Sequence, residues 1–114
     1  MEKTQESSEY EGEKYFCTKE TLQETLDRFG VAVIPNVLTT EETTNMLSGM
    51  WDFFEEITET WEQPMDRNDK STWVGIHKLF PMHSMLIQYF SVGHAQVSWD
   101  LRQNEKLVDI FAHF

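Results

Sequence analysis

A long one-sided helix after Thr39 constrains this chain more than any other feature of its sequence. Thr39 and Glu42 have the spacing of a capping box, which predicts that a helix begins there. Apolar side chains then recur three or four residues apart, on one stripe of a helix that Gln63-Pro64 ends: Leu47, Met50, Phe54, Ile57 and Trp61. A helix of this kind depends on cover for its apolar stripe, so other parts of the 114 residues must pack on it.

Two shorter elements are predicted before this helix. Residues 18–29 have helical periodicity, with Thr18 as the cap and Gly30 just beyond the last apolar residue, where a left-handed C-cap is needed. The apolar, mostly β-branched run 31–34 follows, closed by Pro35. Apolar residues on both faces of an extended segment predict a buried strand.

The second half of the chain has weaker signals. Residues 65–71 are polar and predict an exposed loop, and 73–76 predict a short strand or extended segment. One or two helical turns are expected within 80–89, and another within 98–103. Asn104 caps a last helix with the stripe Leu107, Phe111 and Phe114. Together these elements predict an α+β fold, mostly helical, with one or two strands.

The charge and composition exclude several classes of protein. Lys and Arg number 9 against 20 Asp and Glu, a net charge of -11, which disfavours nucleic-acid and anionic-membrane surfaces. No apolar run approaches a membrane span, and Cys17 alone cannot form an internal disulfide. The start lacks signal-peptide features, so we expect an intracellular, cytoplasmic protein. We expect residues 1–16 to be a flexible acidic tail and 17–114 to be the folded part.

The histidines do not have the spacing of a metal site. A non-haem iron site needs two imidazoles and a carboxylate, often with the first two ligands as H-x-D or H-x-E on one strand. No histidine here has an acidic residue two positions later; they are His77, His83, His94 and His113. Each is interpreted as an ordinary surface or core side chain.

The segment 93–103 is the most unusual part of the sequence. It places Trp99, Asp100 and Arg102 close together, with a glutamine on either side. Arg102 has the geometry to bind a carboxylate with two parallel hydrogen bonds. The alternative is a capping or ion-pair arrangement of Asp100 with Arg102 that orients the last helix. Both interpretations stay open at this point.

Two motifs resemble the amino-terminal part of phytanoyl-CoA dioxygenase-like proteins, which are iron(II)- and 2-oxoglutarate-dependent oxygenases. The first comprises Gly30, Val31, Val33, Ile34, Pro35, Asn36, Val37, Leu38 and Thr39. The second comprises Gln96, Trp99, Asp100, Arg102, Gln103 and the helix from Lys106 to Phe114. The resemblance covers residues from about 20 to 114.

The resemblance implies that this chain is the incomplete front of a double-stranded β-helix, or jelly roll. In the family the H-x-D iron pair, the distal histidine and the arginine that holds 2-oxoglutarate lie in the barrel, which would begin after Phe114. Iron(II) and 2-oxoglutarate are thus implied for a full-length parent, and no catalytic, cofactor-binding or metal residue is assigned here. Gln96, Trp99 and Arg102 are candidates for the mouth of the site.

Two functions are therefore expected. In the first, the parent hydroxylates an unidentified small-molecule or acyl substrate, and this chain, cut before the catalytic barrel, is inactive until the missing barrel joins it. An apolar last turn without a capping residue suggests such a cut. In the second, the chain is a non-catalytic acidic helical module that binds a partner protein through an apolar stripe around Trp51, Phe54, Phe111 and Phe114.

Overall fold

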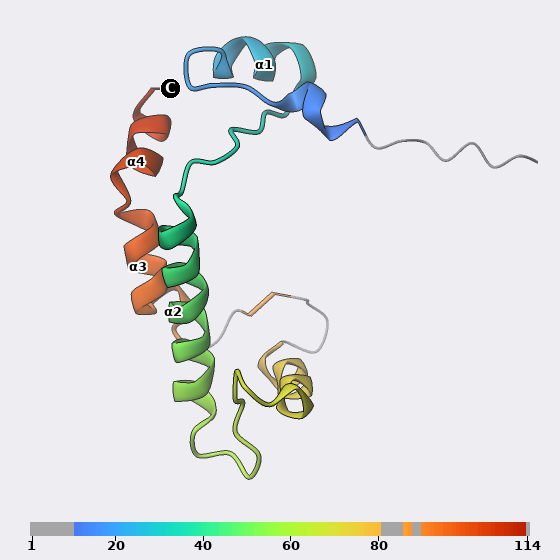
Figure 1. The fold of residues 1–114 in the computed structure, drawn as a ribbon, viewed down its shortest axis with the longest axis vertical. Helices are drawn as coiled ribbons and strands as arrows, with labels where there is room; N and C mark the ends of the chain where they lie inside the picture. Colours follow the sequence, from blue (N-terminus) through green and yellow to red (C-terminus); the bar gives the residue numbers. More distant parts are fainter. Residues whose placement is uncertain (1–10, 81–85, 88–89, 114) are drawn as a thin grey trace, which may run out of the picture. The chain divides into compact units, whose positions relative to one another are not determined.

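The computed structural model describes residues 11–80, 86–87 and 90–113 (Figure 1). The chain divides into two compact units, one of residues up to Val37 together with residues 113–114, and the other of Leu38–Ala112. The described helices, of which η1 to η3 are 3-10 helices, are η1 (Gly12–Tyr15), α1 (Leu22–Phe29), α2 (Thr40–Thr58), η2 (Lys70–Leu79), η3 (Val92–His94), α3 (Gln96–Arg102) and α4 (Glu105–Ala112).

Helix α1 begins later than predicted but ends where predicted. Thr18 and Thr21 form a turn in front of it, in which the Thr18 backbone N–H donates to Thr21 Oγ1 over 3.0 Å, and Thr21 is the N-cap. Gly30 ends the helix in the left-handed conformation, with φ of 71°, and its N–H donates to the Leu26 carbonyl over 2.7 Å. The predicted C-cap is confirmed.

The predicted strand over 31–34 is wrong. In the described part of the chain, this segment pairs only through a parallel bridge between Phe16 and Val33. The Val33 N–H donates to the Tyr15 carbonyl over 2.8 Å, and the Val33 carbonyl accepts from the Cys17 N–H over 2.9 Å. A strand is stabilised by successive cross-strand pairs, and a single bridge supplies too few of them.

The α+β fold class is wrong as well, and with it the expected front of a jelly roll. The described residues form helices and two isolated bridges, with no strand or sheet among them. β-Branched residues favour a strand only when neighbouring strands supply packing for them. The second candidate strand, 73–76, lies inside η2.

Helix α2 carries the capping box that the sequence predicts. The Glu42 N–H donates to Thr39 Oγ1 over 3.1 Å, and the Thr39 N–H donates to Glu42 Oε2 over 3.2 Å. The helix ends at Thr58, before the predicted stop at Gln63. Thr58 explains this end, because its hydroxyl accepts from the Met65 N–H over 2.9 Å and thereby fixes the turn that follows.

The core of the second unit lies on the carboxyl-terminal half of α2. Phe54, Met65 and Leu79 are buried together, and partly buried apolar residues pack on them: Trp51, Phe53, Ile57, Trp61, Ile76 and Ile87. Residues 65–79 thus cover one end of the long helix (Figure 1). Leu47 and Met50, on the same predicted stripe, remain exposed.

Helix η2 replaces the predicted short strand and part of the predicted loop. Asp69 starts it by accepting a hydrogen bond from the Ser71 N–H over 3.0 Å. Thr72, Gly75 and Leu79 are buried three and four residues apart, so one side of a helix faces the core. That one-sided burial favours a helical turn over an extended segment.

The two last helices are confirmed close to their predicted positions. Asn104 caps α4, since its Oδ1 accepts from the Lys106 N–H over 3.1 Å. Lys106 also reaches α2, where its Nζ lies 2.7 Å from Glu42 Oε2. Helix α3 packs against α2, with Val97 next to Gly49.

Some predicted features fall outside the described residues. They are residues 1–10 of the expected tail, the parts of the expected turn at 81–85 and 88–89, and Phe114. Of the expected tail, residues 12–15 form η1 and Phe16 makes the bridge to Val33. Among the described residues, no helix combines the length and the apolar character that crossing a membrane requires.

Candidate functional site

Helix α3 brings the three candidates Gln96, Trp99 and Arg102 onto one short element but gives them separate roles. Gln96 Nε2 donates to Asp100 Oδ1 over 2.7 Å, one helical turn further on. This bond engages the carboxylate that was a candidate partner of Arg102. Among the described residues, no hydrogen bond or ion pair joins Asp100 to Arg102.

Arg102 holds the segment in front of α3. Its Nη1 donates to the Gly93 carbonyl over 2.7 Å, and its guanidinium lies 5.7 Å from the centre of the Trp99 ring. Trp99 also lies beside His94, with the ring centres 5.9 Å apart. These contacts tie η3 to α3, so the guanidinium is occupied by a backbone carbonyl. Neither sequence-based interpretation of Arg102 foresaw this contact.

A polar hollow of about 490 Å³ lies between α2 and the segment from Phe90 to Asp100. Its charged and polar lining includes Ser48, Asp52, Glu56, His94, Gln96 and Asp100. Asp52 is already paired with Arg67. The hollow brings Gln96 and His94 close to α2, but Trp99 and Arg102 are outside its lining.

The described histidines have different neighbours. His77 packs against Phe80 with ring centres 6.2 Å apart, and His94 packs against Trp99. His113 is exposed, and His83 lies outside the described residues. Within the described ranges, no three His, Cys, Asp or Glu side chains are grouped so that they could hold a metal ion.

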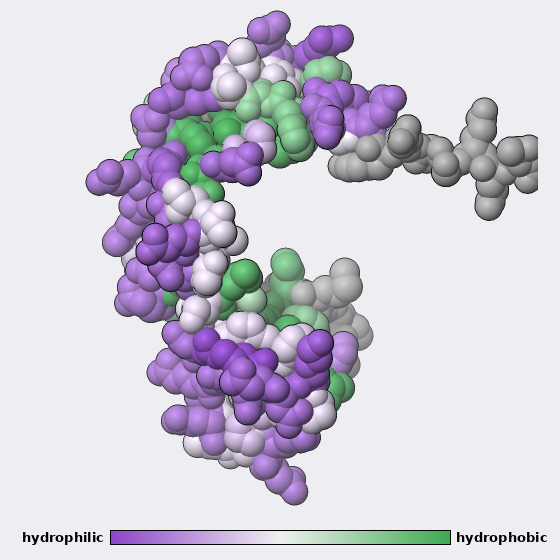
Figure 2. Space-filling view, viewed as in Figure 1, coloured by the Kyte–Doolittle hydropathy of each residue, from purple (hydrophilic) through white to green (hydrophobic). Residues whose placement is uncertain are grey.

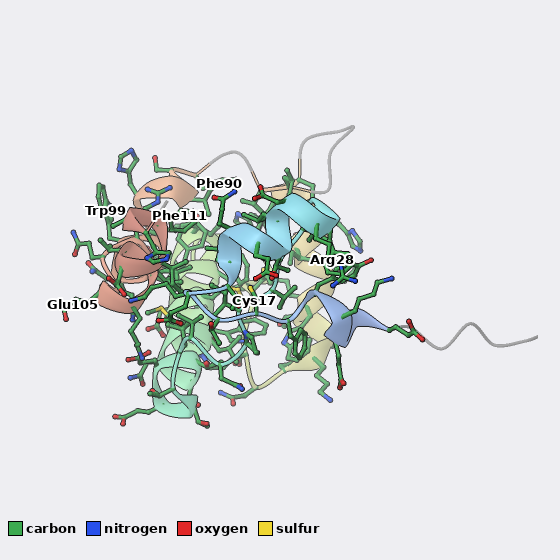
Figure 3. The ribbon with its side chains drawn as sticks, turned by 90° about the horizontal axis from the view of Figure 1, so that it is seen from above. Cys17, Arg28, Phe90, Trp99, Glu105 and Phe111 are labelled. Carbon is green, nitrogen blue, oxygen red and sulfur yellow. The ribbon has the colours of Figure 1, made fainter. Side chains whose placement is uncertain are left out.

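An apolar groove of about 630 Å³ lies where α3 meets α4. It is lined by Leu101, Arg102, Leu107, Val108, Phe111 and Ala112. Phe111 is 73% exposed and Val108 is 52% exposed, so the apolar atoms of the groove face the solvent. Figure 3 shows Phe111 and Glu105 on this part of the molecule, and Figure 2 shows apolar patches interrupting a largely hydrophilic surface.

The apolar stripe predicted for partner binding is partly wrong. Phe54 is buried and Trp51 is half-buried against the core, where the two rings meet edge to face at 5.9 Å. Both belong to the interior because residues 65–79 cover that end of α2. Phe111 is exposed as predicted, and Phe114 lies outside the described residues.

Two acidic residues of α4 lie outside the groove lining. Glu105 and Asp109 are one turn apart on α4, on the side of the helix next to Val108 and Ala112 at about 100° per residue. Lys106, three residues before Asp109 and next to it on the helix surface, donates to Glu42 and holds the pKa of that carboxyl below its ordinary value. The Lys106 contact also fixes α4 on α2.

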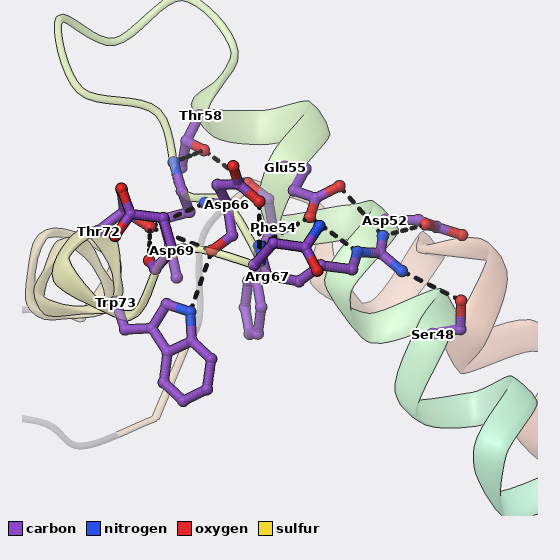
Figure 4. A network of polar contacts seen from close by, with 12 residues as sticks. Ser48, Asp52, Phe54, Glu55, Thr58, Asp66, Arg67, Asp69, Thr72 and Trp73 are labelled. Atoms are coloured by element: carbon purple, nitrogen blue, oxygen red, sulfur yellow. Dashed lines mark hydrogen bonds and ion pairs between the residues drawn. The ribbon is translucent and has the colours of Figure 1, made fainter.

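The strongest polar network of the second unit is structural and was not predicted (Figure 4). Arg67 donates from Nε to Glu55 Oε1 over 2.8 Å, from Nη2 to Asp52 and from Nη1 to Ser48 over 3.2 Å. These bonds lower the pKa of Glu55 and raise that of Arg67. Asp52 and Glu55, three residues apart on α2, were the available signal, since residues at that spacing share a helix face.

Comparisons with protein-family models, with curated proteins and with solved structures found no match to this chain.

Proposed function

We propose that this chain is a protein-binding module whose main site is the groove between α3 and α4. Its occupant is an amphipathic helix with one apolar face and Lys or Arg residues along the flanks of that face. The proposal keeps the second function expected from the sequence and moves its surface from Trp51 and Phe54 to the α3–α4 groove.

The observation that carries the proposal is the exposure of Phe111 within an apolar groove. Large apolar side chains that gather at a surface mark interaction sites, because their exposure to water is unfavourable. Leu101, Val108 and Phe111 are all exposed and line one groove. A groove between two helices suits the apolar face of a third helix, with anchors three and four residues apart.

The negative charge of the chain favours apolar partners that also carry basic residues. The net charge is -11, and Glu105 precedes the groove residues on α4, whereas Arg102 in the groove lining donates to the Gly93 carbonyl. A second copy of this chain would bring the same negative charge to the contact, which is unfavourable for association. A partner with basic flanks gains from the same field, so its association would be faster at low salt.

The test uses two synthetic amphipathic helices with the same leucine face, one with lysine flanks and one with glutamate flanks. We expect the lysine peptide to bind the full chain more tightly, as measured by isothermal titration calorimetry. Phe111→Ala should weaken that binding by about tenfold or more, as loss of an interface anchor does. Leu47→Ala is the matched control, because Leu47 is an exposed apolar residue of α2 outside the groove, and it should leave binding unchanged.

Three outcomes would overturn the proposal. The first is equal affinity for the two peptides, and the second is an equal effect of Phe111→Ala and Leu47→Ala. The third is a dimer of the chain, in sedimentation equilibrium, that Phe111→Ala dissociates, because a second copy would then occupy the groove.

The oxygenase hypothesis stays a proposal about a complete parent protein. It is supported by the resemblance of residues 30–39 and 96–114 to phytanoyl-CoA dioxygenase-like proteins. This hypothesis expects the chain alone to bind iron(II) weakly and to turn over no 2-oxoglutarate. Tight one-to-one binding of iron(II) in the presence of 2-oxoglutarate would contradict both this hypothesis and the binding-module proposal.

A further inference from the structure

The polar hollow beside α2 lies between two antiparallel walls. Val97 of α3 lies against Gly49 of α2. Lys106, further along the chain, pairs with Glu42, which is nearer the start of α2. The chain from Val97 onward therefore runs antiparallel to α2, as Figure 1 shows for α3. The hollow between these walls has a volume of about 490 Å³, within the range of small-molecule sites.

Two carboxylates of the hollow are available to a positively charged ligand. Among the described residues, the Glu56 carboxylate has no hydrogen-bond or ion-pair partner. Asp100 accepts from Gln96 through Oδ1, which leaves its Oδ2 free for a ligand. Asp52 is already paired with Arg67. The described lining includes no Lys or Arg, and the chain carries a net charge of -11, so the hollow attracts cations.

These two carboxylates are at separate ends of the hollow. Asp100 is three residues beyond Val97, and Glu56 is seven residues beyond Gly49. Because Val97 contacts Gly49 and the walls are antiparallel, the helical rise places Asp100 and Glu56 roughly 15 Å apart along the helix axis. One metal ion cannot reach both, since its ligand atoms lie within about 2.6 Å of it. The spacing fits an extended organic cation.

Apolar side chains lie between the two carboxylates. Phe53 and Val97 line this stretch and are half-buried. Phe90, which is 45% exposed, adds a second aromatic ring to the lining. Methylene groups pack favourably on such side chains, and aromatic faces attract ammonium groups. The lining thus combines separated negative charges with an apolar surface.

We propose that the polar hollow binds a linear aliphatic polyamine of about the length of spermine. One terminal ammonium group pairs with Asp100 and the other with Glu56, and the methylene groups pack on Phe53 and Val97. A short diamine reaches only one of the two carboxylates. The hollow and the α3–α4 groove share no lining residue, so this site is separate from the protein-binding site proposed above.

The test titrates the full chain with three amines by isothermal titration calorimetry at low salt. Putrescine is a short dication, diaminododecane has the same charge and about the length of spermine, and spermine is the expected ligand class. We expect one-to-one binding of spermine, and binding of diaminododecane about tenfold tighter than that of putrescine, because only the longer amines span both carboxylates. The Gln96 and Val97 amide signals in NMR spectra should shift and saturate at the same ratio.

Three variants separate the hollow from general attraction to an acidic protein. Glu56→Gln and Asp100→Asn should each weaken spermine binding by about fivefold or more, because each removes one charge-assisted contact. Asparagine at position 100 keeps an acceptor for Gln96. Glu62→Gln is the matched control, since it removes the same charge from an exposed residue outside the hollow and should change the affinity by less than about twofold.

Three results would overturn the proposal. The first is an equal loss of spermine affinity in all three variants, which would show that spermine responds to net charge alone. The second is equal affinity for putrescine and diaminododecane. The third is binding of calcium ions alone that Glu56→Gln and Asp100→Asn both abolish, because a metal would then occupy the hollow. Phe111→Ala should leave spermine binding unchanged, so failure here is distinct from failure of the α3–α4 groove.

Discussion

Thr58 connects α2 to the chain that returns over its end. Its side chain is fully buried, donates to the Phe54 carbonyl over 2.8 Å and accepts from the Met65 N–H over 2.9 Å. Met65 is itself buried. A hydroxyl that accepts from a buried N–H contributes more to the free energy of unfolding than a hydroxyl at the surface, because no water molecule can take its place.

We expect Thr58→Val, which keeps the shape of the side chain, to lower the free energy of unfolding by about 1–3 kcal/mol. Thr44→Val is the control, since the Thr44 hydroxyl donates to the Thr40 carbonyl over 2.9 Å on the exposed side of the same helix. Its effect should stay within about 0.5 kcal/mol. Urea titration followed by tryptophan fluorescence measures both, and equal losses would contradict the role given to Thr58.

Arg67 gives the second unit a predictable response to acid. Its hydrogen bonds hold the pKa of Glu55 below the ordinary value of 4.5. The folded state therefore binds fewer protons than the unfolded state in this range. The stabilisation is complete above the ordinary pKa and is lost as the pH falls through the lowered one.

We expect Arg67→Met to remove part of this pH dependence. Between about pH 6 and about pH 3, the free energy of unfolding should fall less steeply in the variant than in the original chain. Arg28→Met is the control, because Arg28 lies over the Phe29 ring in the other unit. Parallel curves for the original chain and Arg67→Met, from urea unfolding at each pH, would refute this assignment.

Among the elements, α2 and α3 approach closely because Gly49 has no side chain. A Cβ built on Gly49 would lie 3.2 Å from Val97 Cβ, closer than nearly all such contacts. Glycine inside a helix is nevertheless unfavourable relative to alanine. The two effects oppose each other at this position, and the identity of residue 97 decides between them.

We expect Gly49→Ala to be more favourable in a Val97→Gly background than in the original chain. With the Cβ of residue 97 removed, the helix gains up to about 1 kcal/mol from alanine at position 49 without the close contact. With Val97 present, the contact offsets that gain. A double-mutant cycle of unfolding free energies measures the difference, and additive effects would show that the two residues are not coupled.

Local signals explain which elements were predictable from the sequence. The capping box of Thr39, the C-cap Gly30 and the cap Asn104 act within a few residues, and all three are confirmed. The strand at 31–34 failed because a strand depends on partners that are distant in sequence. η2 was missed because the burial of Thr72, Gly75 and Leu79 depends on packing against residues distant in sequence, such as that of Leu79 with Phe54.

The candidate site was predictable only in part, for the same reason. Phe111 lies on the apolar stripe of α4, which sequence periodicity can locate, and it is exposed there. The contact of Arg102 with Gly93 depends on how η3 turns back onto α3. Nothing in residue type or spacing distinguishes a guanidinium that binds a carbonyl from one that binds a carboxylate.

At the scale of the whole molecule, the two units should unfold separately. All four tryptophans lie within Leu38–Ala112, whereas the bridge of Val33 lies in the other unit. We expect tryptophan fluorescence and exchange of the Val33 amide to give different urea midpoints, because each unit has its own internal contacts. Coincident midpoints in both measurements would show a single cooperative transition.

The segment 31–34 also bears on aggregation between copies of the chain. A short β-branched run with exposed backbone can nucleate fibrils when many copies meet. The 20 acidic residues keep copies apart at neutral pH, since each chain carries a net charge of -11. That protection fades near the isoelectric point of about 4.6, where we expect a fibril-binding dye to detect aggregates that Ala32→Pro suppresses.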